Sequence, residues 1–252
     1  LSPFGVKTVL LTGSVKGVKR KCLLENIANG EADVIIGTHA LIQKTVVYKN
    51  LGFVVVDEQH RFGVKQRQEL LAKSSRMPHL LAMTATPIPR SLQLTVFGEL
   101  DISTIDELPS GRKPIKTQIW APTNIANLYD SVEIEVSKGR QVYIICSLID
   151  DNPDNDTKSV EIEYRKLRST IFNHRRVAML HGKMKSDEKD KIMNDFSVHK
   201  IDILISTTVV EVGVNVPNAT IMIIENADKF GLSQLHQLRG RVGRGEYQSY
   251  CH

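Results

Sequence analysis

Short apolar runs alternate along the chain with segments of helical periodicity. The runs lie at 9–11, 34–36, 53–56, 80–83, 142–145, 177–180, 203–206 and 221–224. They lack the polar alternation of a half-buried strand and are typical of parallel strands covered on both faces. Between them we expect helices at 17–29, 64–73, 124–138, 158–173, 186–197 and 231–238. This alternation predicts an α/β fold with parallel sheets and right-handed crossovers.

The strand and helix pattern occurs twice, with a break between the two parts. The break contains Pro109, Gly111 and Pro114 and has no helical or strand period. We therefore predict a first lobe at 1–108, a linker at 109–116 and a second lobe at 117–252. Ligands of open parallel sheets bind beyond the carboxyl ends of the strands. Polar motifs follow several of the apolar runs, so we expect the functional site in the cleft between the lobes.

Composition adds a weak indication of a nucleic-acid partner. The 252 residues are 41% hydrophobic and carry a net charge of +5, with basic clusters at 16–21 and 239–244. No stretch approaches the ~20 apolar residues of a membrane span. The acidic run 150–156 is interpreted as a solvated loop, with a metal site as the less favoured alternative. Three scattered cysteines, Cys22, Cys146 and Cys251, have no metal spacing and indicate reduced thiols.

The two termini indicate a piece of a longer protein. Leu1 is not an initiator methionine, and the residues after it have no basic segment leading into an apolar core, as a signal peptide would. The sequence stops at His252 without a closing turn or polar tail.

Asp57 and Glu58 directly follow the apolar run 53–56. Phosphoryl transfer from a nucleoside triphosphate needs Mg²⁺ and a group that positions the attacking water. Asp57 suits the metal role and Glu58 the water-activating role. A solvated turn is the alternative for an isolated acidic pair, and the other motifs disfavour it.

Other polar motifs also begin where an apolar run ends. They are Gly37-Thr38-His39, Thr84-Ala85-Thr86, His181-Gly182 and Ser206-Thr207-Thr208. Backbone amides and hydroxyls at such positions can bind phosphodiester oxygens. Taken singly, each motif fits a simple strand-ending turn equally well or better.

The stretch 237–244, QLRGRVGR, is the most specific motif. Arginine carries a permanent charge and a planar fork that matches phosphate oxygens. Arginines placed across a cleft can stabilise charge on a transferring γ-phosphoryl group. A general basic patch on nucleic acid is the alternative, and the close spacing of the arginines and glycines disfavours it.

Together these motifs resemble the superfamily 2 helicases and, more closely, the RecG-type ATP-dependent DNA helicases of bacteria. The resemblance rests on GTHALIQ (37–43), DEQHRFGVKQR (57–67), MTATPIPR (83–90), LHGKM (180–184), STTVVEVGVNVPNAT (206–220) and ENADKFGLSQLHQLRGRVGRG (225–245). It implies two RecA-like lobes, the first truncated at its N-terminus and the second at its C-terminus, with ATP and DNA bound between them. It also implies a cytoplasmic, nucleoid-associated, monomeric enzyme that acts on stalled forks and Holliday junctions.

The resemblance also implies roles for individual residues. Asp57 and Glu58 correspond to the acids that serve Mg²⁺ and water, and Gln59 and His60 couple nucleotide state to DNA. Thr84 and Thr86 link hydrolysis to strand separation. The residues expected to contact the nucleotide are Gln237, Gly213, Asn215, Arg241 and Arg244, of which the two arginines reach the γ-phosphate. The residues expected to contact the DNA backbone are Thr38, His39 and Thr207.

The chain departs from the family pattern in two ways. Asn215 stands where an aspartate is usual, which keeps the size and loses the charge. No GxxxxGK[ST] phosphate loop occurs; the nearest stretch, 37–45, has Ile42 in place of the second glycine. By the resemblance, that loop and a DNA-binding wedge domain lie upstream, and a helical hairpin lies downstream. We therefore expect the isolated chain to be inactive.

Three other functions stay open at this stage. The transcription-repair coupling factor has a similar motor, but the exact sequences DEQHRFGV and MTATPIPR favour the RecG type. A degenerate module that only binds nucleic acid is supported by Asn215 and disfavoured by the intact acids and arginines. An RNA helicase is disfavoured only by the exact sequences of the motifs.

Overall fold

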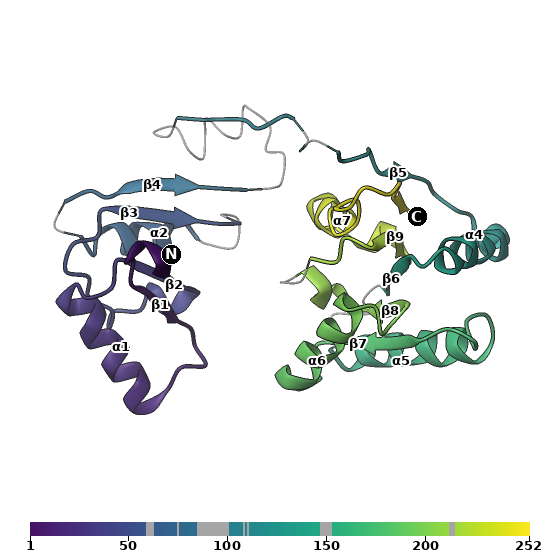
Figure 1. The fold of residues 1–252 in the computed structure, drawn as a ribbon, viewed down its shortest axis with the longest axis horizontal. Coiled ribbons are helices and arrows are strands. Elements are labelled where there is room, and N and C mark those ends of the chain that lie inside the picture. Colours follow the sequence, from purple (N-terminus) through teal and green to yellow (C-terminus); the bar gives the residue numbers. More distant parts are fainter. Residues whose placement is uncertain are drawn as a thin grey trace. The chain divides into compact units, whose positions relative to one another are not determined.

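A computed structural model describes residues 1–58, 63–74, 76–84, 101–107, 109, 111–146, 153–211 and 215–252. The chain divides into two compact units, Leu1–Pro87 and Ile88–His252 (Figure 1). We call them unit 1 and unit 2 and describe each by itself.

Unit 1 contains two pairs of parallel strands. Strand β1 (Thr8–Leu11) pairs with β2 (Val34–Gly37), and β3 (Phe53–Val56) pairs with β4 (His79–Ala82). Helix α1 (Gly17–Asn29) connects the first pair, and α2 (Val64–Leu71) lies between the strands of the second. Helix α1 is capped by Gly30, whose left-handed φ of 71° lets its N–H bond back to the last turn. Figure 1 shows α1 beside β1 and β2.

The strands of unit 1 are covered on one face only. In β3, Val54 and Val56 are buried, whereas Phe53 is 59% exposed and Val55 is 52% exposed. Leu10 of β1 is exposed in the same alternating way, and Ile36 of β2 is also exposed. Within the described residues, the expectation of strands buried on both faces is therefore met on one face only.

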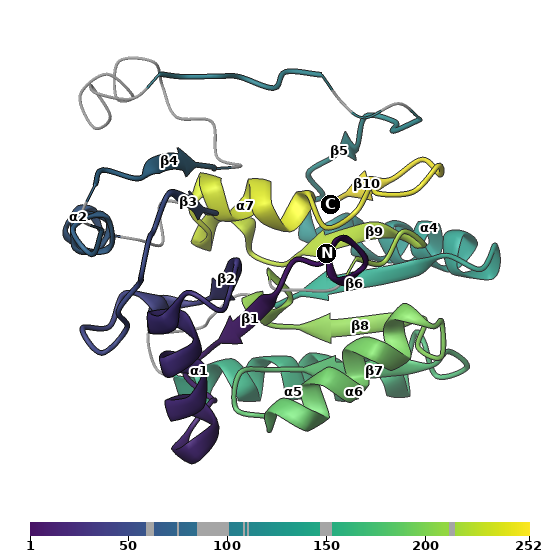
Figure 2. The same cartoon turned by 60° about the vertical axis from the view of Figure 1, so that its left-hand side comes forward.

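Unit 2 is built around one parallel sheet with the strand order β5-β10-β9-β6-β8-β7 (Figure 2). Its strands are β5 (Lys116–Thr117), β6 (Gln141–Ile145), β7 (Val177–Leu180), β8 (Ile203–Ser206), β9 (Ala219–Ile224) and β10 (Tyr250–Cys251). Its helices are α4 (Ile125–Ser137), α5 (Pro153–Ser169), α6 (Ser186–Ser197) and α7 (Leu232–Arg239). The predicted parallel α/β fold is confirmed.

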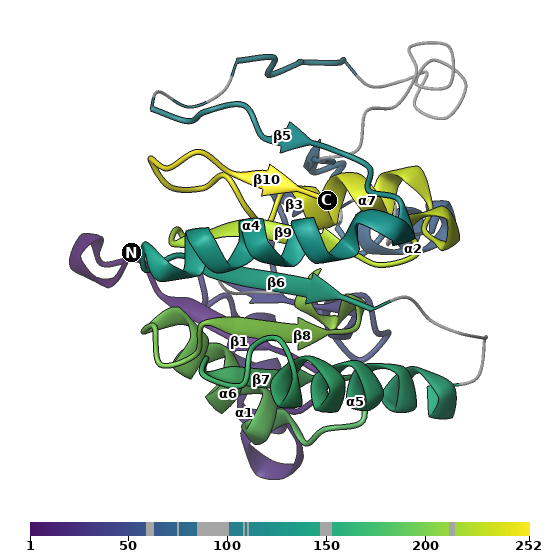
Figure 3. The same cartoon turned by 90° about the vertical axis from the view of Figure 1, so that its right-hand side faces the viewer.

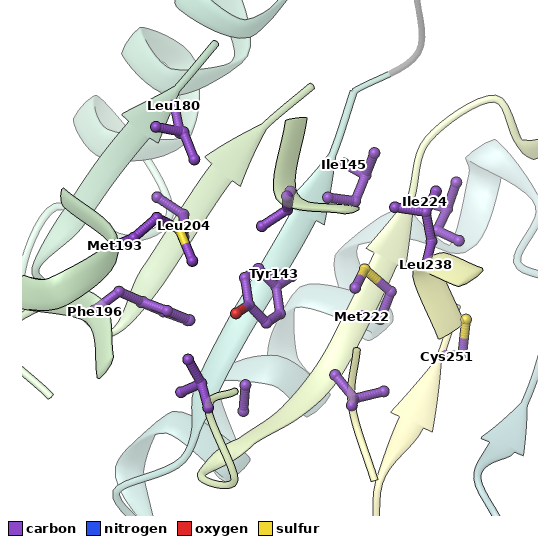
Figure 4. Close-up of a cluster of buried hydrophobic side chains, with 14 of the residues drawn as sticks. Tyr143, Ile145, Leu180, Met193, Phe196, Leu204, Met222, Ile224, Leu238 and Cys251 are labelled. Atoms are coloured by element: carbon purple, nitrogen blue, oxygen red, sulfur yellow. The ribbon is translucent and has the colours of Figure 1, made fainter. Parts of the chain in front are cut away.

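Helices cover both faces of this sheet. Helices α4 and α5 lie over one face (Figure 3), where Leu128, Val132 and Leu167 pack on alternate residues of β6, β8 and β9. Helices α6 and α7 lie over the other face, where Tyr143 of β6 packs at 4.8 Å between ring centroids on Phe196 (Figure 4). Every residue of β6, β8 and β9 is buried. These three runs are therefore strands covered on both faces, as predicted, whereas β7 at the sheet edge is only partly buried.

One helix of unit 2 begins earlier than expected, and the end of the predicted linker pairs with the sheet. Helix α5 begins at Pro153, five residues before the predicted start, so the second half of the acidic run 150–156 is helical and not a loop. A first-turn proline has no N–H to lose, and acids near a helix N-terminus are favoured by its dipole. Lys116, the last residue of the predicted linker, opens β5, and Ile115 packs on the core of unit 2. The predicted domain bounds stay a prediction.

Among the described residues, no helix combines the length and apolar character that crossing a bilayer requires.

Candidate active site

In unit 1, the acids that follow β3 lie beside the residues that follow β4. The register pairs Val56 with Ala82, so Asp57 and Met83 leave the same edge of the pair. The Met83 N–H donates to the Val56 carbonyl at 2.8 Å, which keeps the two chains together past the strand ends. Thr84 follows directly. The structure thus brings Asp57, Glu58 and Thr84 to one edge.

Glu58 has an unusual backbone conformation. Its φ is 49°, in the left-handed region that residues other than glycine rarely adopt. Its N–H donates to Asp57 Oδ1 at 2.9 Å, so the two acids are tied together locally. Such strained backbone costs on the order of 1–3 kcal/mol and clusters at functional sites, although His199 and Asn226 share the conformation here. The conformation turns Glu58 away from the strand direction, while Asp57 stays exposed.

The β1 and β2 edge of unit 1 presents hydroxyl groups and amides. The register pairs Leu11 with Gly37, so Thr12 and Thr38 follow at the same edge. A Cβ at Gly37 would overlap the Leu11 carbonyl oxygen, which explains the glycine. Thr38 and His39 are exposed, as a DNA contact requires.

A pocket of about 240 Å³ adjoins His39 between the 39–44 segment and α2. Lys73 holds this segment in place, because its Nζ donates to the carbonyls of Gln43 and Val46 at 2.6 and 2.8 Å. Arg20 Nη2 donates to Gln43 Oε1 at 2.7 Å. The predicted basic cluster at 16–21 is therefore connected to the predicted DNA-contacting segment.

In unit 2, His181 and Thr207 follow adjacent strands. Leu180 of β7 pairs with Ser206 of β8, and the Thr207 N–H donates to the Leu180 carbonyl at 3.2 Å. Both side chains are buried, and among the described residues Thr207 Oγ1 has no hydrogen-bond partner. The expected DNA contact of Thr207 stays a prediction, and the burial of its side chain favours a structural role.

The arginine segment follows α7. Arg241 and Arg244 are half-buried, on either side of the buried Val242 and of Gly243. Arg244 Nε donates to the Gly240 carbonyl at 2.9 Å. Burial raises the pKa of Tyr143 to about 12, and the charges of Arg241 and Arg244 oppose this rise. Both arginines therefore lie near the same part of β6.

The third arginine of the motif is oriented differently. Arg239 Nη2 lies 3.0 Å from His236 Nδ1, one turn back on α7. Its charge opposes the rise in the Cys251 pKa caused by burial, which places Arg239 toward β10. The structure thus separates Arg239 from the pair predicted to reach phosphate.

The structure describes two of the six remaining candidate residues. Gln237 is half-buried on α7, and Asn215 is exposed before the buried Val216. Gln59, His60, Thr86 and Gly213 lie outside the described residues.

Sequence reasoning assigned no role to Glu225 or to Thr12 and Ser14, although each follows a strand. Thr12 Oγ1 and Ser14 Oγ are hydrogen-bonded at 2.7 Å next to Thr38.

Glu225 follows β9, and its N–H donates to the Ile145 carbonyl at 2.9 Å. Burial and the charge of Glu163 raise its pKa to about 7, against the opposing charge of Lys166. The sequence contained a signal for Glu225, because an acid directly after an apolar run is also the pattern that indicated Asp57.

The raised pKa of Glu225 predicts a pH-dependent stability of unit 2. The folded state holds this proton more tightly than the unfolded state, so the contribution is favourable at low pH and is lost as the pH rises from about 4.5 to about 7. Glu225→Gln removes the buried charge. We expect it to raise the free energy of unfolding above pH 7 by on the order of 1–3 kcal/mol, and to change it little below pH 4.5.

Denaturant unfolding of wild type and variant between pH 4.5 and 8.5 measures this difference. Glu246→Gln, which removes an exposed acid in the same unit, is the control and should show no such trend. An equal effect of Glu225→Gln at all pH values would contradict the assignment.

Two family models match the chain. Residues 2–95 match "DEAD/DEAH box helicase", and residues 123–246 match "Helicase conserved C-terminal domain". The ATP-dependent DNA helicase RecG of Staphylococcus epidermidis is 57% identical over 251 residues, and that of Bacillus subtilis is 55% identical over 246 residues. Each alignment covers 98% of this chain and 36% of the relative. The chain therefore spans about a third of the length of the curated relatives it matches.

Solved structures agree with this assignment. RecG bound to a three-way DNA junction is similar with a TM-score of 0.70 and 39% identity, over 99% of this chain and 32% of that chain. Saccharomyces cerevisiae Dbp5 bound to RNA and ADP BeF3 is similar with a TM-score of 0.62 and 17% identity, over 98% of this chain and 63% of that chain, and shows the shared fold alone. The chain belongs to the superfamily 2 helicases and, within them, to the RecG type.

Proposed function

We propose that these residues form the motor of an ATP-dependent DNA helicase that remodels branched DNA, such as stalled forks and Holliday junctions. The observation that carries the proposal is the edge of unit 1 where Asp57 and Glu58 lie beside Thr84. Acids that can serve Mg²⁺ and water, next to a hydroxyl residue, support a role in nucleotide hydrolysis in a chain of the RecG type. RecG itself has been observed on a three-way DNA junction.

The chemistry of the exposed Asp57 carboxylate fits Mg²⁺ bound together with nucleotide phosphates. Mg²⁺ commonly takes one or two carboxylates and completes its shell with water and phosphate. No cluster of three or more His, Cys, Asp or Glu ligands occurs among the described residues, so a cage made of such side chains is absent from that part. When bound, Mg²⁺ would neutralise phosphate charge.

Glu58 and the arginines perform the remaining steps. Glu58 accepts a proton from the attacking water, and its backbone N–H is bonded to the Asp57 carboxylate. Arg241 and Arg244 stabilise the charge on the γ-phosphoryl group. Asn215, which is exposed and neutral, keeps the ability to hydrogen-bond a ribose hydroxyl.

Contact with DNA is proposed at the edge that carries Thr38 and His39. This edge presents hydroxyl groups and amides beside the basic residues at 16–21. Such groups bind phosphates and carry little sequence information, so affinity should fall with salt and depend on DNA shape. We also propose that the protein is cytoplasmic, nucleoid-associated and monomeric.

Strand separation by the full-length protein tests this function. We expect ATP-dependent unwinding of forked and four-way DNA and much weaker unwinding of duplex RNA of the same length. Equal activity on duplex RNA would favour an RNA helicase. Binding of DNA without hydrolysis would favour a degenerate binding module. Displacement of stalled RNA polymerase without fork unwinding would favour a transcription-repair coupling factor.

The isolated 252-residue chain is expected to hydrolyse ATP at no more than the background rate. Its sequence has no GxxxxGK[ST] loop, so no run of backbone amides of that kind wraps the triphosphate. Phosphate release in the presence of forked DNA measures the rate, with the full-length protein as the control. Hydrolysis by the chain within tenfold of that control would contradict the prediction.

A further inference from the structure

The segment 114–118 is fastened along the residues that follow the arginines. The Lys116 N–H donates to the Ser249 carbonyl, and the Gln118 N–H donates to the Cys251 carbonyl, both at 3.0 Å. Gln248 Nε2 donates to the Pro114 carbonyl at 2.8 Å. These bonds form the short parallel pair of β5 and β10, and they fix the position of Ile115 within unit 2.

The side chain of Ile115 lies against the backbone between the two arginines. Gly243 has a φ of 72°, and a Cβ built there would lie 2.8 Å from Ile115 Cγ1 and 3.1 Å from Cδ1. Ile115 also packs on the core cluster that contains Leu238 and Val242. It therefore fills the space that a side chain at 243 would need, and it covers the turn between Arg241 and Arg244.

The sheet supports the following residues of the loop from another side. A Cβ at Gly245 would lie 2.5 Å from the Pro217 carbonyl oxygen. The Arg140 guanidinium lies 3.2 Å from the ring centroid of Tyr247, and its Nη1 donates to Asn218 Oδ1 at 3.2 Å. These supports come from the ends of β6 and β9 in the middle of the sheet. Ile115 comes from the two-residue edge strand β5 and its approach.

We propose that Ile115 is a positioning residue for Arg241 and Arg244 in ATP hydrolysis. Glycine at position 243 leaves the turn many backbone conformations, and the Ile115 side chain restricts them. Charged groups stabilise a transition state only when they are held in place beforehand, and a displacement of about 1 Å can cost on the order of 10² in rate. The inference rests on the proposed role of the two arginines in hydrolysis.

Steady-state ATP hydrolysis by the full-length protein with forked DNA tests the role. For Ile115→Ala we expect kcat to fall about tenfold and the KM for ATP to change less than twofold, because the arginines act mainly in the transition state. Ile115→Val keeps both γ-carbons and should lose less than threefold. The matched control is Ile119→Ala, which removes the same atoms from a fully exposed side chain four residues later and should leave kcat unchanged.

Hydrogen–deuterium exchange on the full-length protein gives a second readout that does not depend on activity. Ile115→Ala should accelerate exchange at 240–249, with the central strands β6 and β8 unchanged. If the alanine variant fails to fold, Ile115→Val replaces it and should show the same local change at smaller amplitude.

The outcomes separate the two proposals. An inactive wild-type protein together with local acceleration at 240–249 would reject the proposed function and retain the support of the turn by Ile115. A kcat within twofold of wild type for Ile115→Ala, a rise in KM without a fall in kcat, or unchanged exchange at 240–249 would overturn the role of Ile115.

Discussion

Glu58→Gln in the full-length protein is expected to lower DNA-stimulated ATP hydrolysis by about 10²- to 10⁴-fold, the usual contribution of a general base. Glutamine keeps the size of the side chain and can keep the left-handed backbone and the N–H bond to Asp57. It cannot accept the proton of the attacking water. ATP binding should change less than threefold, because the phosphates and the metal ion do not depend on this carboxylate.

Single-turnover hydrolysis and equilibrium binding of a fluorescent ATP analogue measure the two effects separately. Glu31→Gln is the matched control, since it removes an exposed acid from the same unit. Hydrolysis within tenfold of wild type in Glu58→Gln would show that another group activates the water.

Arg241→Ala and Arg244→Ala are each expected to lower kcat by about 10³-fold or more, the effect of removing an arginine that stabilises phosphoryl charge. Lysine should restore little, because an ammonium group lacks the planar fork. Arg244→Ala also removes the bond to the Gly240 carbonyl, so some loss of local order accompanies it.

Rapid-quench hydrolysis measures these losses. Arg165→Ala is the control, because that side chain is 76% exposed on α5 and pairs only with Glu161 among the ion pairs described. Losses below tenfold at both Arg241 and Arg244 would contradict their assignment to the γ-phosphate. Arg239, which contacts His236, should tolerate glutamine with a loss below tenfold.

The sequence predicted most regular elements because their signals are local. Helices α1 and α6 and strand β3 have the expected bounds, since each is marked by a complete periodic or apolar run. Strands β5 and β10 were missed because a strand of two residues is too short to form an apolar run in the sequence. The exposed face of β3 was also missed, because apolar residues alone do not show what covers them.

The candidate site was predictable in composition but not in geometry. Strand ends placed Asp57 and Thr84 at one edge, as the rule for parallel sheets implies. The left-handed backbone of Glu58, the burial of Thr207 and the contact of Ile115 with Gly243 were not predictable. Each depends on packing between residues distant in sequence or on a backbone conformation that the residue type does not favour.

The most direct test of a branched-DNA motor is the rate of ATP hydrolysis by the full-length protein with forked DNA, with linear duplex DNA and without DNA. We expect hydrolysis to be lowest without DNA, higher with duplex and highest with forked DNA. Glu58→Gln should lower it by about 10²-fold or more in all three conditions. Hydrolysis that is equal in the three conditions, or that stays within tenfold of wild type in Glu58→Gln, would contradict this result.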